Sequence, residues 1–106
     1  MRILFVCSKN RWRSRTAEEI FKHNGIHEIK SAGTESSARI KLTNQDLYWA
    51  DLILVMEDKH LEKLYSNYDI QKGNEKIHVL GIPDIYKYMD TELIQLLKIS
   101  TIEYFD

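Results

Sequence analysis

Hydrophobic and polar positions follow two alternating patterns along the chain. Short, almost continuous apolar runs predict strands of a parallel sheet that is covered on both faces. Longer segments with apolar residues three or four positions apart predict helices that bury one face. The apolar runs predict strands at residues 2–6, 27–31, 52–56 and 76–80. The periodic segments predict helices at residues 14–24, 43–50, 59–68 and 91–104.

Signals at the ends of these segments support the helices. Gly25 follows the first periodic segment, where glycine commonly ends a helix. Thr43 and Asp46 have the spacing of a capping box, and Asp90 is placed to cap the last helix. The inner side of the first helix is expected to hold Ala17, Ile20, Phe21 and Asn24. Residues 81–88 are expected to form a loop, and residues 32–42 are the least ordered-looking stretch.

The alternation of strands and helices predicts an α/β fold, a three-layer α/β/α sandwich around a four-stranded parallel sheet. Right-handed crossovers place helices on both faces of such a sheet. With 106 residues and no linker or repeat, residues 1–106 are expected to form a single domain. Ligands of open α/β sheets bind beyond the carboxyl ends of the strands. The loops after the first and fourth predicted strands are therefore where a site is expected.

Composition narrows the class of protein. No apolar run is long enough to cross a bilayer, and the chain enters a core strand directly after Met1, so we expect neither a membrane segment nor a signal peptide. A single cysteine fits a reducing, cytoplasmic location. The net charge is −1, yet residues 1–15 hold five basic residues and no acidic one. Such a local concentration of positive charge attracts small anions, whereas nucleic acid binding needs a more extended basic surface.

A cysteine, five residues, an arginine and a serine directly follow the first apolar run. A loop between a strand and a helix forms a cradle for phosphate, because its amides and the helix N-terminus point at one spot. Cys7 at the start of this cradle is favoured as a thiolate nucleophile, and Arg13 can grip two anionic oxygens with its planar fork. The cradle itself is expected to consist of Ser8, Lys9, Asn10, Arg11, Trp12 and Ser14.

Several motifs in this order resemble the low-molecular-weight protein tyrosine phosphatase family. The segment 5–18 (FVCSKNRWRSRTAE) is similar to the family signature, and 31–34 (SAGT) to its second-strand motif. The segment 50–56 (ADLILVM) resembles its third strand, and 83–86 (PDIY) falls where the family keeps its acid loop. The chain departs from the common pattern at Lys9, Trp12, Arg15 and Ile85, and it is shorter than typical members, like a short bacterial branch of the family.

The resemblance implies a flavodoxin-like sheet and a phosphatase without a cofactor. It implies that Asp84 is the general acid and base, and that Asn10 and Ser14 brace the loop, with Ser31 joining them. From the residues alone, Ser14 either bonds the thiolate or caps the following helix. Asp90 is the alternative acid, although its simpler role is the helix cap.

Three aromatic residues and four histidines complete the candidate set. Trp12, Tyr86 and Tyr88 either wall the substrate entrance or pack between loops. The scattered histidines at positions 23, 27, 60 and 78 are predicted to be non-catalytic.

The sequence therefore predicts a phosphomonoester hydrolase that acts through phosphocysteine, with protein phosphotyrosine as the favoured substrate. Phosphoarginine and small phosphoesters remain open as alternative substrates. No metal is expected, because Arg13 and the loop amides supply the positive charge. Two alternatives remain open. One is an arsenate reductase on the same scaffold, which would need an external thiol because Cys7 has no partner cysteine. The other is a non-catalytic module that binds phosphate or a phosphopeptide.

Overall fold

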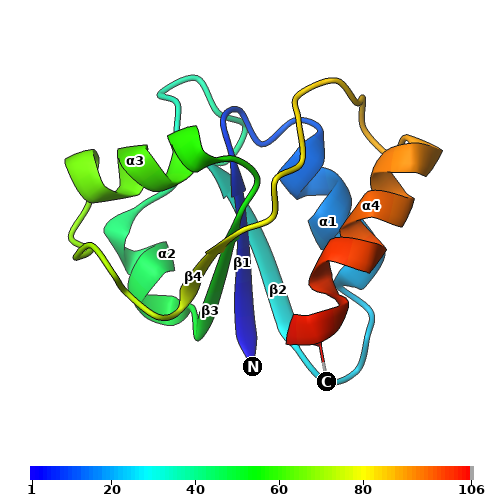
Figure 1. Ribbon diagram of the computed structural model, residues 1–106, viewed down its shortest axis with the longest axis horizontal. Coiled ribbons are helices and arrows are strands. Elements are labelled where there is room, and N and C mark those ends of the chain that lie inside the picture. The colour runs from blue at the N-terminus through cyan, green and yellow to red at the C-terminus, as the bar shows by residue number, and fades with distance from the viewer. Residues whose placement is uncertain (106) are drawn as a thin grey trace.

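The computed structural model describes residues 1–105 and has one parallel sheet at its centre (Figure 1). Its strands are β1 (Arg2–Cys7), β2 (Glu28–Gly33), β3 (Leu52–Val55) and β4 (Ile77–Val79), in the order β2-β1-β3-β4. All three strand pairs are parallel. The predicted four-stranded parallel sheet is confirmed, and Asp106, the last residue of the predicted domain, lies outside the described residues.

Helices cover both faces of the sheet, as the three-layer prediction requires. They are α1 (Arg13–Phe21), α2 (Asn44–Trp49), α3 (Asp58–Asn67) and α4 (Thr91–Thr101), and a short 3-10 helix, η1 (Ile102–Tyr104), follows α4. Figure 1 shows α1 and α4 on one side of the strands and α2 and α3 on the other. Within residues 1–105, no helix is sufficiently long and apolar to cross a membrane.

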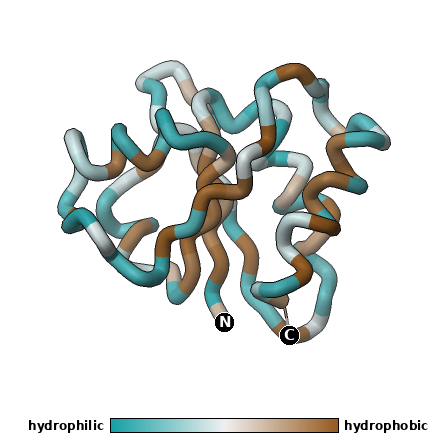
Figure 2. Tube along the Cα trace, viewed as in Figure 1, coloured by the Kyte–Doolittle hydropathy of each residue, from teal (hydrophilic) through white to brown (hydrophobic). Residues whose placement is uncertain are grey.

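Each face of the sheet has its own hydrophobic core, because successive strand residues point to opposite faces. In β1, Ile3 and Phe5 face α1 and α4, whereas Leu4 and Val6 face α2 and α3. All four side chains are fully buried. Figure 2 shows the resulting distribution, with hydrophobic strands at the centre and mostly hydrophilic segments on the outside. The continuous apolar pattern of the strand thus reflects burial on both sides.

The helix ends agree with the prediction where a cap defines them. Thr43 and Asp46 form the predicted capping box at the start of α2. By contrast, α1 ends at Phe21, so Asn24 is not on its inner side. Asn24 is exposed, and its side-chain oxygen accepts the backbone N–H groups of Ile26 and His27, which stabilises the turn after the helix.

The segment predicted to be the least ordered is in fact held against the Cys7 loop. Backbone N–H groups of Thr34, Glu35 and Arg39 donate to the carbonyls of residues 7, 8 and 9, each over 2.9 Å. The segment has little regular structure, yet these bonds hold it as a second layer beneath the loop. Residues 32–42 looked the least ordered in the sequence because local patterns do not reveal that the segment bonds to the Cys7 loop.

We predict that Gly33→Ala damages the Cys7 loop as well as the fold. A Cβ at Gly33 would lie 2.5 Å from the Ser8 carbonyl oxygen, 2.7 Å from the Ala38 Cβ and 3.0 Å from the Asn10 nitrogen. Two of these atoms are backbone and cannot turn away, so thermal unfolding should show a loss of roughly 1–3 kcal/mol. Adding Ala38→Gly should restore only part of the loss; full restoration would show that the side-chain contact alone matters.

Candidate active site

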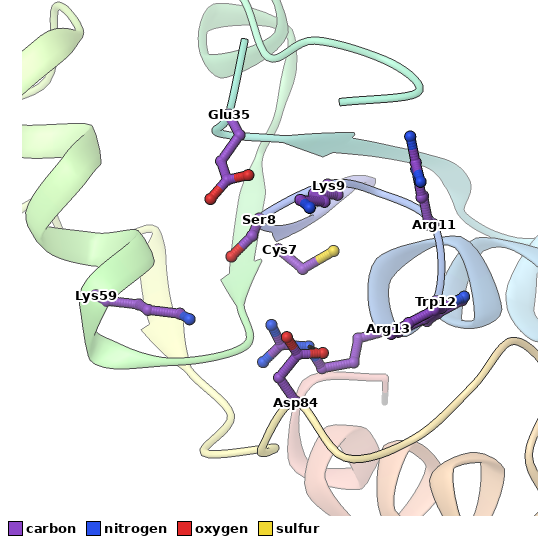
Figure 3. A pocket seen from close by; sticks show the side chains of 9 residues that line it. All are labelled: Cys7, Ser8, Lys9, Arg11, Trp12, Arg13, Glu35, Lys59 and Asp84. Atoms are coloured by element: carbon purple, nitrogen blue, oxygen red, sulfur yellow. Dashed lines mark ion pairs between the residues drawn. The ribbon is translucent and has the colours of Figure 1, made fainter. Parts of the chain in front are cut away.

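The loop between β1 and α1 encloses a pocket at the carboxyl end of the sheet. The pocket has a volume of about 200 Å³. It is lined by Cys7, Ser8, Lys9, Arg11, Trp12, Arg13, Glu35, Lys59 and Asp84 (Figure 3). Asn10 has a φ of 56°, a left-handed backbone conformation that asparagine tolerates better than most residues and that lets the loop wind tightly. Sequence reasoning placed this pocket correctly but missed Glu35 and Lys59, which come from other elements.

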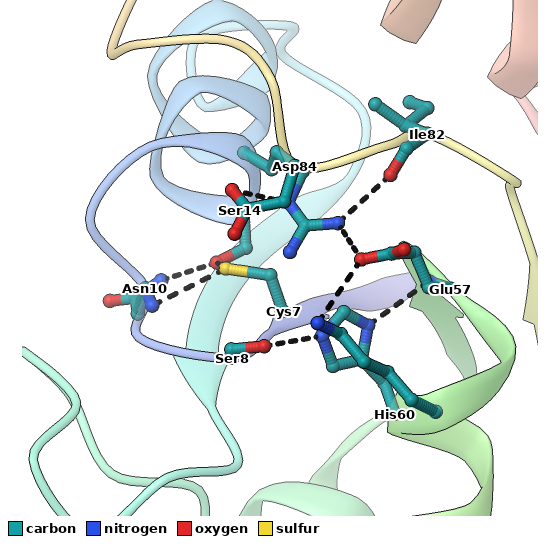
Figure 4. Close-up of polar contacts among 10 residues, drawn as sticks. Cys7, Ser8, Asn10, Ser14, Glu57, His60, Ile82 and Asp84 are labelled. Atoms are coloured by element: carbon teal, nitrogen blue, oxygen red, sulfur yellow. Dashed lines mark hydrogen bonds and ion pairs between the residues drawn. The ribbon is translucent and has the colours of Figure 1, made fainter.

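The Cys7 sulfur lies at the floor of this pocket with two hydrogen-bond partners. The side chain is 3% exposed, and the backbone N–H of Asn10 donates to Sγ over 3.3 Å. The Ser14 Oγ lies 2.9 Å from Sγ and accepts a bond of 2.7 Å from the Asn10 side-chain amide (Figure 4). Because the amide occupies a lone pair of Ser14, the hydroxyl hydrogen is available to the sulfur. Both donors therefore stabilise negative charge on Cys7.

Ser14 bonds the sulfur and does not cap the helix. The residue preceding α1 is Trp12, and no side chain caps that end of the helix. Ser31 does not join this network as the family resemblance implied, because its hydroxyl donates to the Glu18 carboxylate instead. Ser14 and Asn10 thus bond the thiol of Cys7, whereas Ser31 connects β2 to α1.

The guanidinium of Arg13 is buried and fixed from two sides. Its Nη1 donates to the Glu57 carboxylate, and also to the Ile82 carbonyl over 2.9 Å. These two bonds use both hydrogens of Nη1, so Nε and Nη2 are left as the free edge of the fork. Nε lies 3.7 Å from Asp84 Oδ1, at the pocket. Arg13 is therefore oriented to bind two oxygens of one anion beside Cys7.

Glu57, which follows β3, was not singled out from the sequence. Burial acts to raise its pKa, but the hydrogen bond and positive charge of Arg13 outweigh burial, and the pKa of Glu57 is lowered overall. Its carboxylate is thus ionised where it neutralises the buried guanidinium. The exposed ammonium of Lys59 lies 3.7 Å from the same carboxylate.

His60, predicted from the sequence to be non-catalytic, also contacts the phosphate loop. It is 1% exposed, its Nε2 lies 2.9 Å from Ser8 Oγ, and its Nδ1 accepts the backbone N–H of Glu57 over 3.0 Å. Burial, with the nearby charge of Arg13 as the next cause, lowers the pKa of His60 to about 4. One sequence signal was available: His60 stands three residues after Glu57 at the start of a helix, in the position that completes a capping box.

The structure places Asp84 in the pocket and Asp90 outside it. Asp84 is half exposed and lines the pocket on the side of Arg13 (Figure 3). Asp90 is the N-cap of α4, and its carboxylate accepts the backbone N–H groups of Glu92 and Leu93. The simpler role predicted for Asp90 is the one its geometry supports.

Of the three aromatic residues predicted to wall the entrance, only Trp12 lines the pocket. Tyr86 is 8% exposed and packs into the hydrophobic core beneath α1 and α4. The Tyr88 ring stacks on the Arg15 guanidinium, 4.4 Å from the ring centre, and its hydroxyl donates to Glu19. The two tyrosines were mistaken for pocket residues because sequence cannot tell on which side of a loop a ring packs.

A thiol at the floor of a loop of backbone amides, with an arginine fork aimed at the same space, defines a cysteine-dependent phosphatase on an α/β fold. The family model for low molecular weight phosphotyrosine protein phosphatases matches residues 2–45 of the chain. No curated protein sequence matches the chain. The family model covers β1, the Cys7 loop, α1 and β2, which are the elements that build the floor of the pocket.

Solved structures resemble the chain over almost its whole length. A low molecular weight protein tyrosine phosphatase from T. tengcongensis is 25% identical, with a TM-score of 0.70 over 98% of this chain and 99% of that one. The tyrosine phosphatase Wzb from Escherichia coli K30, in complex with phosphate, is 25% identical, with a TM-score of 0.76 over 97% and 94%. The YwlE arginine phosphatase from Geobacillus stearothermophilus shares the fold at 20% identity, with a TM-score of 0.65 over 96% and 84%.

The family model and these structures confirm the resemblance seen in the sequence. Over residues 2–45, and in its fold as a whole, the chain is similar to the low-molecular-weight protein tyrosine phosphatase family.

We predict that the protein loses stability as the pH falls from about 6.5 to about 4. The pKa of His60 is about 4 in the folded state against an ordinary value of 6.5, so in this window the unfolded chain binds a proton that the folded chain rejects. Linkage then lowers the free energy of unfolding by roughly 3 kcal/mol across the window. Urea unfolding at several pH values measures this, and His60→Gln should flatten the slope.

The matched control is His78→Gln, because His78 lies in β4, away from the Cys7 loop. It should leave the pH dependence of the unfolding free energy unchanged. An unaltered slope in His60→Gln would show that acid destabilisation has another origin.

Proposed function

We propose that this protein hydrolyses phosphate monoesters through a phosphocysteine intermediate and acts on protein phosphotyrosine in the cytoplasm. The observation that carries the proposal is the convergence of the Cys7 sulfur and the free edge of the Arg13 fork on one pocket. The proposal is further supported by Asp84, a half-exposed carboxyl group at the same pocket.

In the first step, the Cys7 thiolate attacks phosphorus in line with the leaving oxygen. The S–P bond forms and the P–O bond to the leaving group breaks, with Asp84 donating a proton to the leaving oxygen. Arg13 and the amides of the loop hold the equatorial oxygens as charge shifts among them. The bonds from Arg13 to Glu57 and Ile82 keep the fork from turning during this step.

In the second step, a water molecule attacks the phosphocysteine. The carboxylate of Asp84 takes a proton from this water, the S–P bond breaks and inorganic phosphate leaves. The Ser14 hydroxyl, 2.9 Å from the sulfur, donates to the thiolate as it departs. Asn10 holds Ser14 in place through its side-chain amide. The enzyme thereby returns to its starting state without a cofactor.

The pocket has room for a phosphate ester of a single aromatic ring, but not for one of a larger group. Its volume of about 200 Å³ accommodates a phosphoryl group and a ring, and the half-exposed Trp12 indole lines one wall. A flat aromatic face favours stacking on a phenyl ring. The exposed Lys9 and Arg11 increase the local positive potential that draws in a phosphorylated substrate.

We predict that wild-type protein hydrolyses para-nitrophenyl phosphate without added metal, in the presence of a reducing agent. Cys7→Ser should abolish turnover, because its hydroxyl is a far weaker nucleophile than a thiolate. Asp84→Asn should lower kcat by about 10² to 10⁴ through loss of the proton donor. Steady-state kinetics against pH measure both effects. Absence of turnover in wild type that still binds phosphate would leave a binding module as the better description.

The matched control for Asp84→Asn is Asp90→Asn. Asp90 caps α4 and asparagine is an equally good N-cap, so this change should cost at most about 1 kcal/mol of unfolding free energy, from the lost negative charge at the helix N-terminus, and leave kcat unchanged. If instead kcat falls in Asp90→Asn and not in Asp84→Asn, the acid is Asp90.

Substrate choice is tested by comparing matched phosphopeptides that carry phosphotyrosine or phosphoarginine. We expect the higher kcat/KM for phosphotyrosine because of the Trp12 wall and the cationic rim, which repels a guanidinium group. Trp12→Ala should raise KM for the phosphotyrosine peptide by about two- to tenfold, since stacking is worth about 0.5–1.5 kcal/mol. A higher kcat/KM for phosphoarginine would reject the proposed substrate class but not the phosphatase mechanism.

A further inference from the structure

His60 links the helix that follows β3 to the phosphate loop. The imidazole is almost fully buried, and its two ring nitrogens have different partners. Nδ1 lies 3.0 Å from the backbone nitrogen of Glu57, and Nε2 lies 2.9 Å from Ser8 Oγ (Figure 4). The residues joined by the second contact are 52 positions apart in the sequence. The contact therefore exists only because β1 and β3 are neighbours that end at the same edge of the sheet.

The partner of Nδ1 fixes where the imidazole carries its hydrogen. A backbone N–H can only donate, so Nδ1 must accept and cannot itself be protonated. The hydrogen of the neutral ring is then on Nε2, which donates it to the Ser8 hydroxyl oxygen. Burial and the charge of Arg13 lower the pKa of His60 to about 4, which keeps this neutral form at ordinary pH.

The direction of the bond to Ser8 decides what the hydroxyl can do. Since Ser8 Oγ accepts from His60, its own hydrogen remains available for a different acceptor. Within residues 1–105, His60 is the hydrogen-bond partner found for this side chain. Ser8 is partly exposed and lines the pocket next to Cys7. The nearest use for that hydrogen is an oxygen of an anion bound in the pocket.

We propose that the Ser8 hydroxyl donates a hydrogen bond to the bound phosphoryl group, and that His60 is a positioning residue that orients this hydroxyl. The inference rests on the proposed function for the identity of the substrate, but it concerns phosphate binding and not the chemical steps. It adds a side-chain donor to the loop amides and to Arg13. It also explains the contact between His60 and Ser8, which packing of the helix against the sheet does not require.

Glu57 makes the arrangement a single unit. Its carboxylate holds Arg13, and its backbone N–H holds His60. Glu57, at the start of α3, thus orients two donors for the same anion. Its carboxylate orients the Arg13 guanidinium, and its backbone N–H orients the Ser8 hydroxyl through His60. A buried imidazole placed there only to fill space would not need to share an anchoring residue with the arginine fork.

The test is a double-mutant cycle that measures the dissociation constant of inorganic phosphate by calorimetry. Ser8→Ala and His60→Leu should each weaken binding by about tenfold, the usual value of a hydrogen bond to a charged group. Because His60 acts through Ser8, the double variant should bind no more weakly than either single one. Independent losses that multiply to about a hundredfold would overturn the proposal.

Two further variants separate positioning from general stability. His60→Gln keeps an N–H donor near Nε2 and should retain phosphate affinity within about threefold of wild type. Leu64→Val removes buried volume from the same helix, away from the loop, and should lower stability without changing phosphate affinity. Equal losses of affinity in Leu64→Val and His60→Leu would show that His60 is merely structural.

A measurement on the wild-type protein covers the case in which His60→Leu does not fold. Nitrogen-15 chemical shifts of the His60 ring report which nitrogen is protonated. Hydrogen on Nε2 at neutral pH supports the proposal, and hydrogen on Nδ1 overturns it. Phosphate binding and ring shifts need no turnover, so failure of this inference remains distinguishable from failure of the proposed catalysis.

Discussion

The site depends on one ion pair, between the buried guanidinium of Arg13 and the partly buried carboxylate of Glu57. A guanidinium that is 2% exposed is stable only with an opposite charge and satisfied hydrogen bonds. Glu57 supplies the charge and the Ile82 carbonyl supplies a further acceptor. These three residues come from α1, the end of β3 and the loop after β4, so the pair fixes the relative positions of the segments that form the pocket. Removing Glu57 would leave the buried guanidinium with only the more distant, half-exposed carboxylate of Asp84, 3.7 Å from Nε.

A second constraint is the close approach of β2 to the phosphate loop. Gly33 pairs with Cys7 in the sheet, and its missing side chain leaves room for the Ser8 carbonyl and the Asn10 amide. The backbone bonds from residues 34, 35 and 39 then hold the loop from below. A loop that must keep its amides pointed at one anion benefits from such bracing, because little reorganisation is then needed when phosphate binds.

Sequence reasoning predicted the fold well because the signals for it are local. The strands were continuous apolar runs, and Thr43 with Asp46 marked the start of α2 by capping chemistry. The loop from Cys7 to Ser14 was recognisable because its chemistry lies within eight consecutive residues. The errors had non-local causes. Tyr86 was assigned to the pocket and packs in the core, and the bonds that hold residues 32–42 are made to the end of β1 and the loop that follows it.

The sequence by itself determined the parallel α/β fold, the nucleophile candidate Cys7 and the arginine fork, since each is encoded by periodicity or by spacing within one loop. Only the tertiary structure decided what holds these groups in place. Glu57 and His60 reach the loop because β3 lies beside β1, and hydrogen bonds between segments some 50 positions apart leave no mark in local patterns. The physical reason is that the order of strands in the sheet determines which side chains become neighbours.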